Sequence, residues 1–356
     1  MAGIPRHPAA FFPTGPAAQS GMAFLNEPVG PLPPFDPGLA AVATAYEEQL
    51  GQFVEVFRAG GVAAAVAAMR EGAAASLAPV GDLTRNGALA VSERIVPGPA
   101  AAPDVELLIC LPTKAQVPYG AIYRIHGGGM IGGDRYLNMP MYADIAEELG
   151  LAVISVEYRL APEHPHPAPV EDCYAGLAWT VKHADELGID PDRLVIMGES
   201  AGANLAAGTA LLARDRSGPP LFGQALLGPM LDDRNSTCSA RQMADAGLGD
   251  TGVVDLCWTA FLDTARGSSE VSPYAAPARA DDLSGLPPTF IDAGSAEIFR
   301  DEAVEYAHRI WQAGGSAELH VWPGGFHSFN IIAPQAPLSQ AANQVSITWL
   351  RRLFAT

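Results

Sequence analysis

Apolar and polar positions along the chain follow two periodicities, one typical of strands and one typical of helices. Short apolar runs, many of them with β-branched residues, indicate strands. The first two flank a loop rich in proline and glycine, as in an antiparallel pair that opens a sheet. The runs predict strands at Leu89–Val96, Val105–Cys110, Ala121–Ile125, Ala152–Val156, Arg193–Met197, Gln224–Leu227, Thr289–Asp292 and Glu318–Val321.

Helical patterns alternate with the later strands. They cover Tyr142–Leu149, Val170–Leu187, Ala201–Arg214, Asp301–Ala313 and Gln340–Phe354. Alternation of this kind implies right-handed crossovers and a mostly parallel sheet with helices on both faces. Ligand sites in such α/β proteins lie at the carboxyl ends of the strands. We therefore look for chemistry in the loops that follow the strands.

The chain divides into three parts by composition. Residues 1–35, rich in proline and glycine, predict an extended arm. Residues 36–80 are rich in alanine and predict two or three helices. The catalytic domain covers residues 81–356 and contains an insertion, at about residues 232–284, with helical patches and no clear strand. We expect this insertion and the N-terminal helices to form a cap above the strand ends.

The pentapeptide Gly198-Glu199-Ser200-Ala201-Gly202 lies between a strand-type run and a helical pattern. That context is the one required by a nucleophile elbow, in which a strained serine projects from a sharp turn. Small residues on both sides let the strand and the helix pack closely. The serine hydroxyl then lies near a helix N-terminus, which favours developing negative charge. We predict that Ser200 is a nucleophile.

A serine nucleophile needs a base, and His327 is the best candidate. It follows the last predicted strand, in the loop Trp322–Phe329, which places it at the same sheet edge as Ser200. The other histidines have weaker claims. His164 and His166 form a pair that could suggest a metal, but prolines flank them and no third ligand is near in the sequence, so no metal is expected.

The histidine needs a carboxylate that fixes its tautomer. The loop after Thr289–Asp292 offers Asp292, Glu297 and Asp301. Asp292 ends the strand and Asp301 opens the next helix, where a capping role suits it. Glu297 lies in the middle of the loop and is preferred, with the two aspartates kept as alternatives.

The loop His126–Gly129 follows a predicted strand and supplies backbone N–H groups where glycines permit close approach to a substrate. We predict an oxyanion hole formed by Gly127, Gly128 and Ala201. A phosphate-binding loop is the alternative. No Lys-Ser/Thr pair follows the glycines, which argues against it.

The formal net charge of −18 argues against nucleic acid and anionic membrane surfaces as partners. The four cysteines are widely spaced, without a CxxC pair, and are expected to be buried free thiols, which fits a reducing compartment. The N-terminal residues do not resemble a secretory signal, and no stretch has the continuous apolarity of a membrane span. A cytoplasmic protein is expected. Whether the chain forms a homodimer is left open by the sequence.

Four segments together resemble the hormone-sensitive-lipase family of α/β-hydrolases, also called bacterial family IV esterases. They are His126–Gly129, Tyr158–Pro165, Gly198–Gly202, and Ala296–Glu302 with Gly324–Phe329. The resemblance implies an α/β-hydrolase fold with a mostly parallel eight-stranded sheet, flanking helices and a helical cap. It also implies hydrolysis of short-acyl carboxylic esters without a cofactor. The segment Tyr158–Pro165, and Asp172 with it, would be structural elements beside the site.

The chain departs from that family's pattern at two positions. Glu297 stands where most members carry aspartate, although some use glutamate. Glu199 stands where aspartate or threonine is usual, and its carboxylate either reaches a polar network beneath the turn or is solvated.

The hypothesis is a serine carboxylesterase that hydrolyses short- to medium-chain acyl esters through an acyl-enzyme. Amides, lactones and carbamates are alternative substrates that the triad does not exclude. A ligand receptor on the same fold, as in plant gibberellin receptors, lacks the histidine that His327 supplies here. Candidate residues for the substrate-binding wall, each also consistent with a core role, are Met130, Trp258, Phe261, Phe326 and Phe329.

Overall fold

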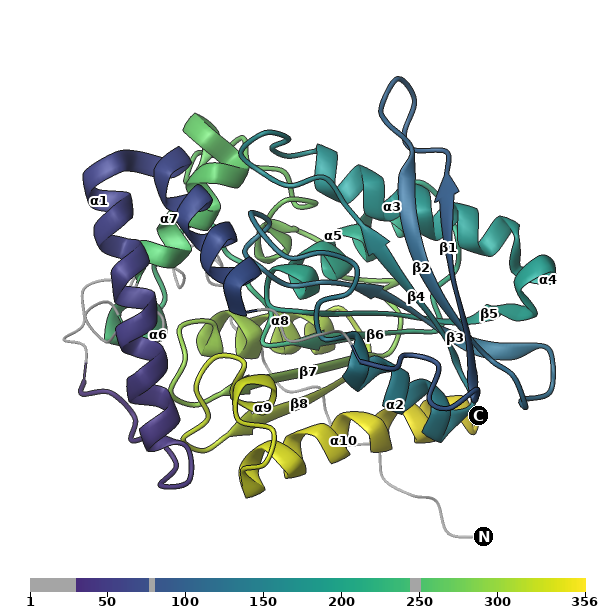
Figure 1. Ribbon diagram of the computed structural model, residues 1–356. Coiled ribbons are helices and arrows are strands. Elements are labelled where there is room, and N and C mark those ends of the chain that lie inside the picture. Colours follow the sequence, from purple (N-terminus) through teal and green to yellow (C-terminus); the bar gives the residue numbers. More distant parts are fainter. Residues whose placement is uncertain (1–29, 77–80, 244–250) are drawn as a thin grey trace, which may run out of the picture.

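The structure is a computed structural model that describes residues 30–76, 81–243 and 251–356 (Figure 1). In these residues eight strands form one sheet in the order β1-β2-β4-β3-β5-β6-β7-β8, so the expected eight-stranded sheet is confirmed. β1 pairs antiparallel with β2, and β2 with β4, while the remaining neighbours are parallel. The strands are β1 (Leu89–Val96), β2 (Val105–Pro112), β3 (Tyr119–Ile125), β4 (Ala152–Glu157), β5 (Ile189–Glu199), β6 (Gly223–Leu227), β7 (Thr289–Gly294) and β8 (Ala317–Trp322).

Helices cover both faces of the sheet (Figure 1). α3 (Ala168–Lys182), α5 (Ala201–Asp215) and α8 (Arg300–Gln312) pack on one face, and α2 (Met139–Leu149) and α10 (Pro337–Phe354) pack on the other. Alternate residues of a strand belong to opposite cores, as Leu107 and Leu108 do. The inner strands are therefore apolar on both faces, which is why their sequences read as continuous hydrophobic runs.

The helix expected at Val170–Leu187 is divided at His183 into α3 and a short α4 (Ala184–Leu187). The backbone N–H of His183 donates to the carbonyl oxygen of Trp179, and its imidazole stacks on the Trp179 ring at 4.3 Å. His183 has φ −108° and ψ 20°, outside the helical range, so α3 ends at Lys182, before the end of the sequence pattern.

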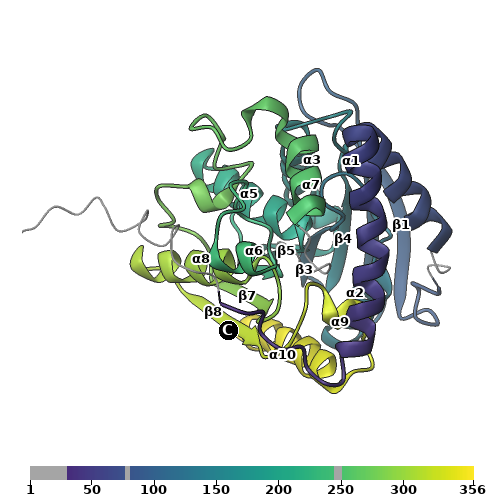
Figure 2. The ribbon, with the colours of Figure 1, turned by 90° about the vertical axis from the view of Figure 1, so that its left-hand side faces the viewer.

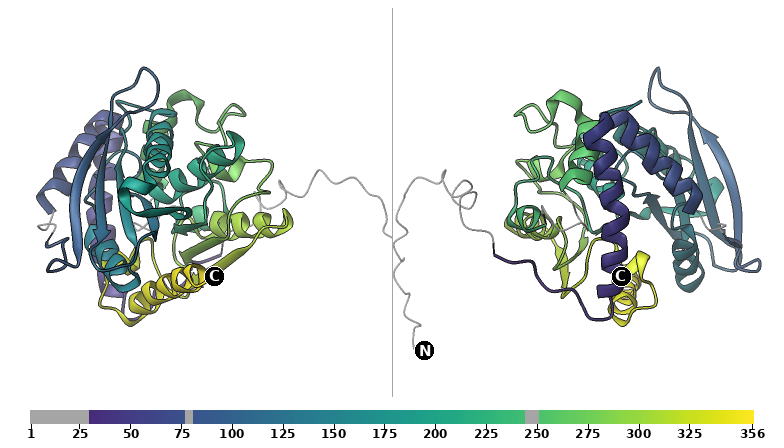
Figure 3. Two further views of the ribbon diagram at one scale, coloured as in Figure 1. Left: turned by 90° about the vertical axis from the view of Figure 1, so that its right-hand side faces the viewer. Right: turned by 60° about the vertical axis from the view of Figure 1, so that its left-hand side comes forward.

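The N-terminal helical segment is α1 (Ala40–Ser76), which bends at Gly61, where φ is 73° and ψ is −172°. The insertion carries α6 (Cys238–Gln242), α7 (Thr251–Leu262) and two 3₁₀ turns (Asp263–Ala265 and Pro277–Arg279). α1 and α7 pack against each other (Figure 2, Figure 3). Both contribute side chains to the cavity that contains Ser200, so both lie above the carboxyl end of β5.

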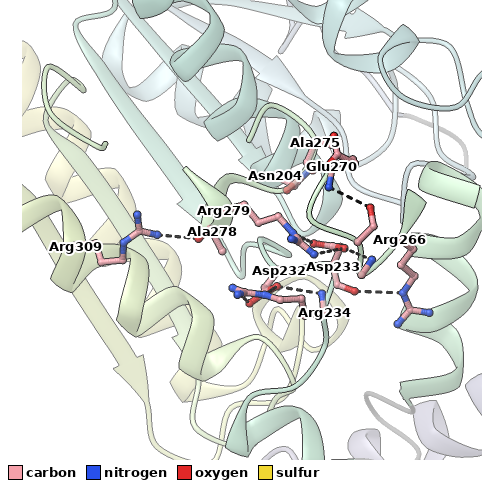
Figure 4. A network of polar contacts seen from close by, with 12 residues as sticks. Asn204, Asp232, Asp233, Arg234, Arg266, Glu270, Ala275, Ala278, Arg279 and Arg309 are labelled. Carbon is pink, nitrogen blue, oxygen red and sulfur yellow. Dashed lines mark hydrogen bonds and ion pairs between the residues drawn. The ribbon is translucent and has the colours of Figure 1, made fainter. Parts of the chain in front are cut away.

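Polar contacts anchor the insertion to the catalytic domain (Figure 4). Within the insertion, Asp233 is fully buried and accepts a hydrogen bond of 2.9 Å from Arg279, which ties the two ends of the insertion together. Asn204, on α5, donates to the carbonyl oxygen of Ala275, and Arg309, on α8, donates to that of Ala278. Because a buried polar group without a partner is costly, these paired groups fix the path of the insertion.

Three further expectations concern the N-terminal arm, membrane spans and a homodimer. Of the predicted arm, residues 1–29 lie outside the described residues, and residues 30–36 form neither helix nor strand. No helix within the described ranges is long and apolar enough to cross a membrane. The homodimer stays a prediction.

All four cysteines are free, and Cys110, Cys173 and Cys257 are buried as expected. The expectation for Cys238 is wrong, because it is exposed. It is the first residue of the short helix α6 at the surface, and only Ser239 and Ala240 of that helix are buried.

Candidate active site

The turn between β5 and α5 holds Ser200 with φ 56° and ψ −121°. A positive φ is strained for a residue with a Cβ and persists only where the surroundings fix it. Ser200 N–H donates to the carbonyl oxygen of Leu227 at 2.8 Å. A Cβ at Gly198 would lie 2.3 Å from the carbonyl oxygen of Gly202, and one at Gly202 would lie 2.2 Å from that of Ile125. Only glycine fits at either position, so the elbow depends on both.

Ser200, His327 and Glu297 lie in one hydrogen-bonded line. His327 Nε2 is 2.9 Å from Ser200 Oγ, and His327 Nδ1 is 3.2 Å from Glu297 Oε1. A carboxylate only accepts, so Nδ1 carries the proton and Nε2 accepts from the serine hydroxyl. Glu297 is buried, and its Oε2 accepts the Gly294 N–H at 2.6 Å. The rings of Phe299 and His327 pack in a T-shaped arrangement, with their centres 4.9 Å apart.

The two alternative carboxylates have other partners. Asp292 accepts from Trp322 Nε1 at 3.2 Å and from Gly228 N–H at 3.3 Å. Burial raises its pKa to about 7, and the nearby Glu297 charge adds to the effect. Asp301 accepts the Ser239 N–H at 2.6 Å and ties α8 to α6. The structure therefore places Glu297, and neither aspartate, against His327.

The predicted oxyanion loop follows β3 and lies directly on the elbow. A Cβ at Gly127 would be 2.9 Å from the carbonyl oxygen of Glu199 and 3.6 Å from Ser200 Cβ. Ala201 is the first residue of α5, where backbone N–H groups have no partner inside the helix. The structure thus brings Gly127 to Ser200, which Ala201 follows directly, and Gly128, with φ 109°, continues the same turn.

His126 holds this loop in place as a neutral side chain. It is fully buried, and its pKa is lowered to about 3 by burial and by the Arg124 charge. Its Nδ1–H donates to the Gly127 carbonyl oxygen at 2.8 Å, because a carbonyl only accepts. Tyr158 stacks on the imidazole at 4.0 Å and donates its hydroxyl to the His126 carbonyl oxygen.

The segment Tyr158–Pro165 connects this loop to other elements. The N–H of Ala161 donates to the carbonyl oxygen of Met130 at 2.9 Å. Arg159 forms a two-pronged ion pair with the buried Asp172 of α3. The segment is therefore a structural brace for the oxyanion loop, with Asp172 as one of its supports.

Arg70 of α1 connects the N-terminal helix to the segment Tyr158–Pro165 and to the oxyanion loop. Its Nε donates to the Ile131 carbonyl oxygen at 2.6 Å, and one Nη donates to that of Ala161 at 2.9 Å. The guanidinium also pairs with Glu163 at 2.8 Å, which lowers the pKa of that carboxyl to about 2. Sequence reasoning missed Arg70, although an arginine in the alanine-rich part of the helix after Gly61 was the available signal.

Ser200 and His327 open into a cavity of about 310 Å³. Its walls are mainly apolar and come from α1, α7, the short helix α9 (Phe329–Ile332) and the loops after the strands. The side chains that line it, apart from the glycines and the groups already placed, are Tyr46, Met69, Leu137, Asn138, Met230, Val253, Val254, Cys257, Ile298, Ser328, Ile331 and Ile332.

The structure corrects the predicted substrate wall, because none of its five residues lines this cavity. All five are buried in the core: Met130, Trp258, Phe261, Phe326 and Phe329. The rings of Trp258 and Phe261 pack on each other at 6.2 Å, and those of Phe326 and Phe329 at 6.4 Å. Large apolar side chains gain most from full burial, so these five pack in the core, and the wall consists mainly of aliphatic side chains with Tyr46 and Phe299.

The sequence left open whether the Glu199 side chain is solvated or reaches a polar network. In the structure Glu199 is buried and not solvated. Its carboxylate contacts Arg124 of β3, Asn138 and Tyr142. The polar network is one of the two alternatives stated for Glu199, but its members were not identified from the sequence. Its signal was Arg124, a charged residue within an apolar strand pattern, which requires a buried partner.

The chain is similar to known esterases in sequence and in structure. The family model described as alpha/beta hydrolase fold matches residues 122–331. Carboxylesterase NlhH of Mycobacterium tuberculosis is 36% identical over 270 residues, which are 74% of this chain and 83% of that protein. An arylesterase of Saccharolobus solfataricus is 32% identical over 59% of this chain and 68% of its own length.

Solved esterase structures also superpose on the chain. A bacterial heroin esterase has 38% identity and a TM-score of 0.77, covering 90% of this chain and 98% of its own. A hyperthermophilic esterase from Pyrobaculum calidifontis has 26% identity and a TM-score of 0.77, covering 91% of this chain and 100% of its own.

Proposed function

The chain belongs to the hormone-sensitive-lipase-like family of α/β-hydrolases and is a carboxylic ester hydrolase, and on that premise we propose that it uses Ser200 as the nucleophile on short- to medium-chain acyl esters. The observation that carries the proposal is the line from Ser200 Oγ through His327 to Glu297, with contacts of 2.9 and 3.2 Å. A serine hydroxyl becomes nucleophilic only when a positioned base takes its proton.

In the first half-reaction, Ser200 Oγ attacks the ester carbonyl carbon while its proton moves to His327 Nε2. The imidazolium that forms is stabilised by Glu297, whose carboxylate already accepts the hydrogen bond from the Nδ1–H of His327. The N–H groups of Gly127, Gly128 and Ala201 receive the developing oxyanion, and the N-terminus of α5 adds its dipole. Collapse of the tetrahedral intermediate passes the Nε2 proton to the leaving alcohol.

In the second half-reaction, His327 removes a proton from water, and the hydroxide attacks the acyl-enzyme carbonyl. The same oxyanion donors serve again, and the proton on Nε2 returns to Ser200 as the acid leaves. No step requires a cofactor.

The cavity supports the limit on chain length. Its volume is about 310 Å³, and apolar side chains from α1, α7 and the loops form most of its wall. Apolar walls favour the alkyl part of a substrate, because burying each methylene contributes about 0.8 kcal/mol. A chain much longer than the cavity gains nothing further from its wall.

A panel of p-nitrophenyl esters from acetate to palmitate tests this function, with and without a serine-reactive phosphonate. We expect kcat/KM to be highest among the short and medium chains and the phosphonate to abolish turnover. Activity that rises steadily to palmitate would contradict the substrate class. Turnover that survives the phosphonate would contradict the serine mechanism.

A further inference from the structure

Glu199 precedes the nucleophile and carries a charge where the chain is almost completely buried. Its side chain is 4% exposed, and that of its partner Arg124 is 0% exposed. An ion pair at such depth is weak evidence for a role in stability, because desolvation of both charges offsets most of their attraction. Its location beside the reacting groups points to another role.

The pair joins the two strands that carry the two parts of the oxyanion hole. Arg124 lies on β3, beside Met197 of β5, and Ile125 lies beside Gly198. β3 leads directly into the loop with Gly127 and Gly128, and β5 leads into Ser200 and Ala201. The ion pair between Arg124 and Glu199 therefore links β3 to β5 just before the two segments that carry the oxyanion donors.

The loop also rests on Glu199 itself. A Cβ at Gly127 would meet the Glu199 carbonyl oxygen at 2.9 Å and its Cγ at 3.4 Å. A shift of the Glu199 side chain would move the surface on which Gly127 lies. The position of one oxyanion donor thus depends on where that carboxylate is held.

Contacts from α2, from Asn138 and from β4 also hold the Arg124–Glu199 pair in place. Tyr142 of α2 donates its hydroxyl to Glu199 Oε2 at 2.8 Å, and Asn138 donates to Oε1 at 3.2 Å. Arg124 donates to Ser155 Oγ of β4 at 3.2 Å and lies over the Tyr142 ring at 5.0 Å. The carboxylate of Glu199 is held by groups from separate elements, so it has little freedom to move.

We propose that Glu199, clasped by Arg124, is a positioning residue that sets the distance between the Gly127–Gly128 loop and Ser200. The inference rests on the proposed function, because a misplaced oxyanion donor matters only if Ser200 forms a tetrahedral intermediate. Loss of this positioning should destabilise the transition state and leave the substrate complex unchanged. The kcat should depend on the pair, while KM should not.

The test uses Glu199→Gln, Arg124→Met and the double variant, with Glu147→Gln on the exposed side of α2 as the matched control. Measured quantities are kcat and KM for p-nitrophenyl butyrate, Tm, and the Ki of a trifluoromethyl ketone, which forms a tetrahedral adduct. We expect all three pair variants to lower kcat by about 10- to 100-fold and to raise that Ki in parallel, with KM within about twofold. The control should match the wild type.

The double variant separates geometry from charge. If the pair acted only through charge, the two single variants would shift kcat in opposite directions and the double variant would restore it. That restoration would overturn the proposal, and so would unchanged kcat and Ki in every variant.

If the Glu199 and Arg124 variants fail to fold, Tyr142→Phe removes one hydrogen bond to Glu199, and it should give a smaller kcat loss at constant KM. An unchanged kcat in that variant would also overturn the proposal. Failure of the proposed function has a different signature, because the wild type itself would then lack phosphonate-sensitive turnover.

Discussion

Oε1 of Glu297 lies 3.2 Å from Nδ1 of His327, while its Oε2 accepts the Gly294 N–H at 2.6 Å. One oxygen is thus anchored to the end of β7 and the other holds the imidazole. Glutamate reaches the histidine from mid-loop with its additional methylene. The same geometry leaves Asp292 and Asp301 bonded to other groups.

The first prediction concerns the acid. Glu297→Gln should lower kcat by about 10²- to 10⁴-fold, because a neutral amide stabilises neither the tautomer nor the imidazolium. Asp292→Asn and Asp301→Asn, assayed at one pH beside it, should each lose less than about tenfold, because neither carboxylate contacts His327. A modest loss at Glu297 beside a collapse at either aspartate would reverse the assignment.

The second prediction concerns Arg70, which holds α1 over the cavity. Arg70→Ala removes hydrogen bonds to the carbonyl oxygens of Ile131 and Ala161, and Met69 beside it lines the cavity. We expect KM for p-nitrophenyl butyrate to rise by about three- to tenfold, with a smaller change in kcat. Arg58→Ala, an exposed arginine on the same helix, is the control. Equal KM values in both variants would show that Arg70 does not hold the wall.

The third prediction is a pH dependence of stability due to Asp292. Its pKa in the folded chain is about 7, above the ordinary value of 3.8, so the folded chain binds the proton more tightly than the unfolded chain. The stabilisation is fully present below pH 3.8 and is lost as the pH rises through 7. Asp292→Asn has no such proton to lose. The free energy of unfolding in urea should therefore fall from about pH 5 to about pH 8 more steeply for the wild type than for the variant. Parallel profiles would refute this assignment.

The fourth prediction concerns the size of the cavity. Val254 of α7 is nearly buried and lines the cavity, so Val254→Trp should fill part of it. We expect kcat/KM for the octanoate ester to fall by about tenfold more than for the acetate ester. Phosphonate labelling of Ser200 should be retained, which shows that the elbow is intact. An equal loss for both esters would place the acyl chain elsewhere.

The sequence predicted the sheet well because its inner strands are buried on both faces and so appear as apolar runs. It placed strand ends less well. β5 begins at Ile189, before the run that starts at Arg193, because Ile189 pairs with Tyr119 of β3, and a break in register separates this pair from the rest of the ladder. Pairing between distant strands decides such ends, and hydrophobic periodicity does not contain that information.

The site, too, has parts that local sequence predicts and parts that only the fold shows. Ser200 and the glycine loop lie in local motifs whose chemistry is visible in the residues themselves. Glu297 had to be chosen among three nearby carboxylates, and only the fold shows which one reaches His327. The cavity wall was missed because it depends on which sides of α1 and α7 face Ser200. The Arg124–Glu199 pair was within reach, since a charge in a buried strand demands a partner.

The central claim is that Ser200 forms the covalent intermediate. The most direct measurement is the intact mass of the protein after incubation with a p-nitrophenyl phosphonate, followed by peptide mapping, for the wild type and for Ser200→Ala. We predict one adduct, on Ser200, that appears in step with loss of esterase activity, and no adduct and only trace turnover in the variant. An adduct on another residue, or substantial turnover by Ser200→Ala, would contradict the account.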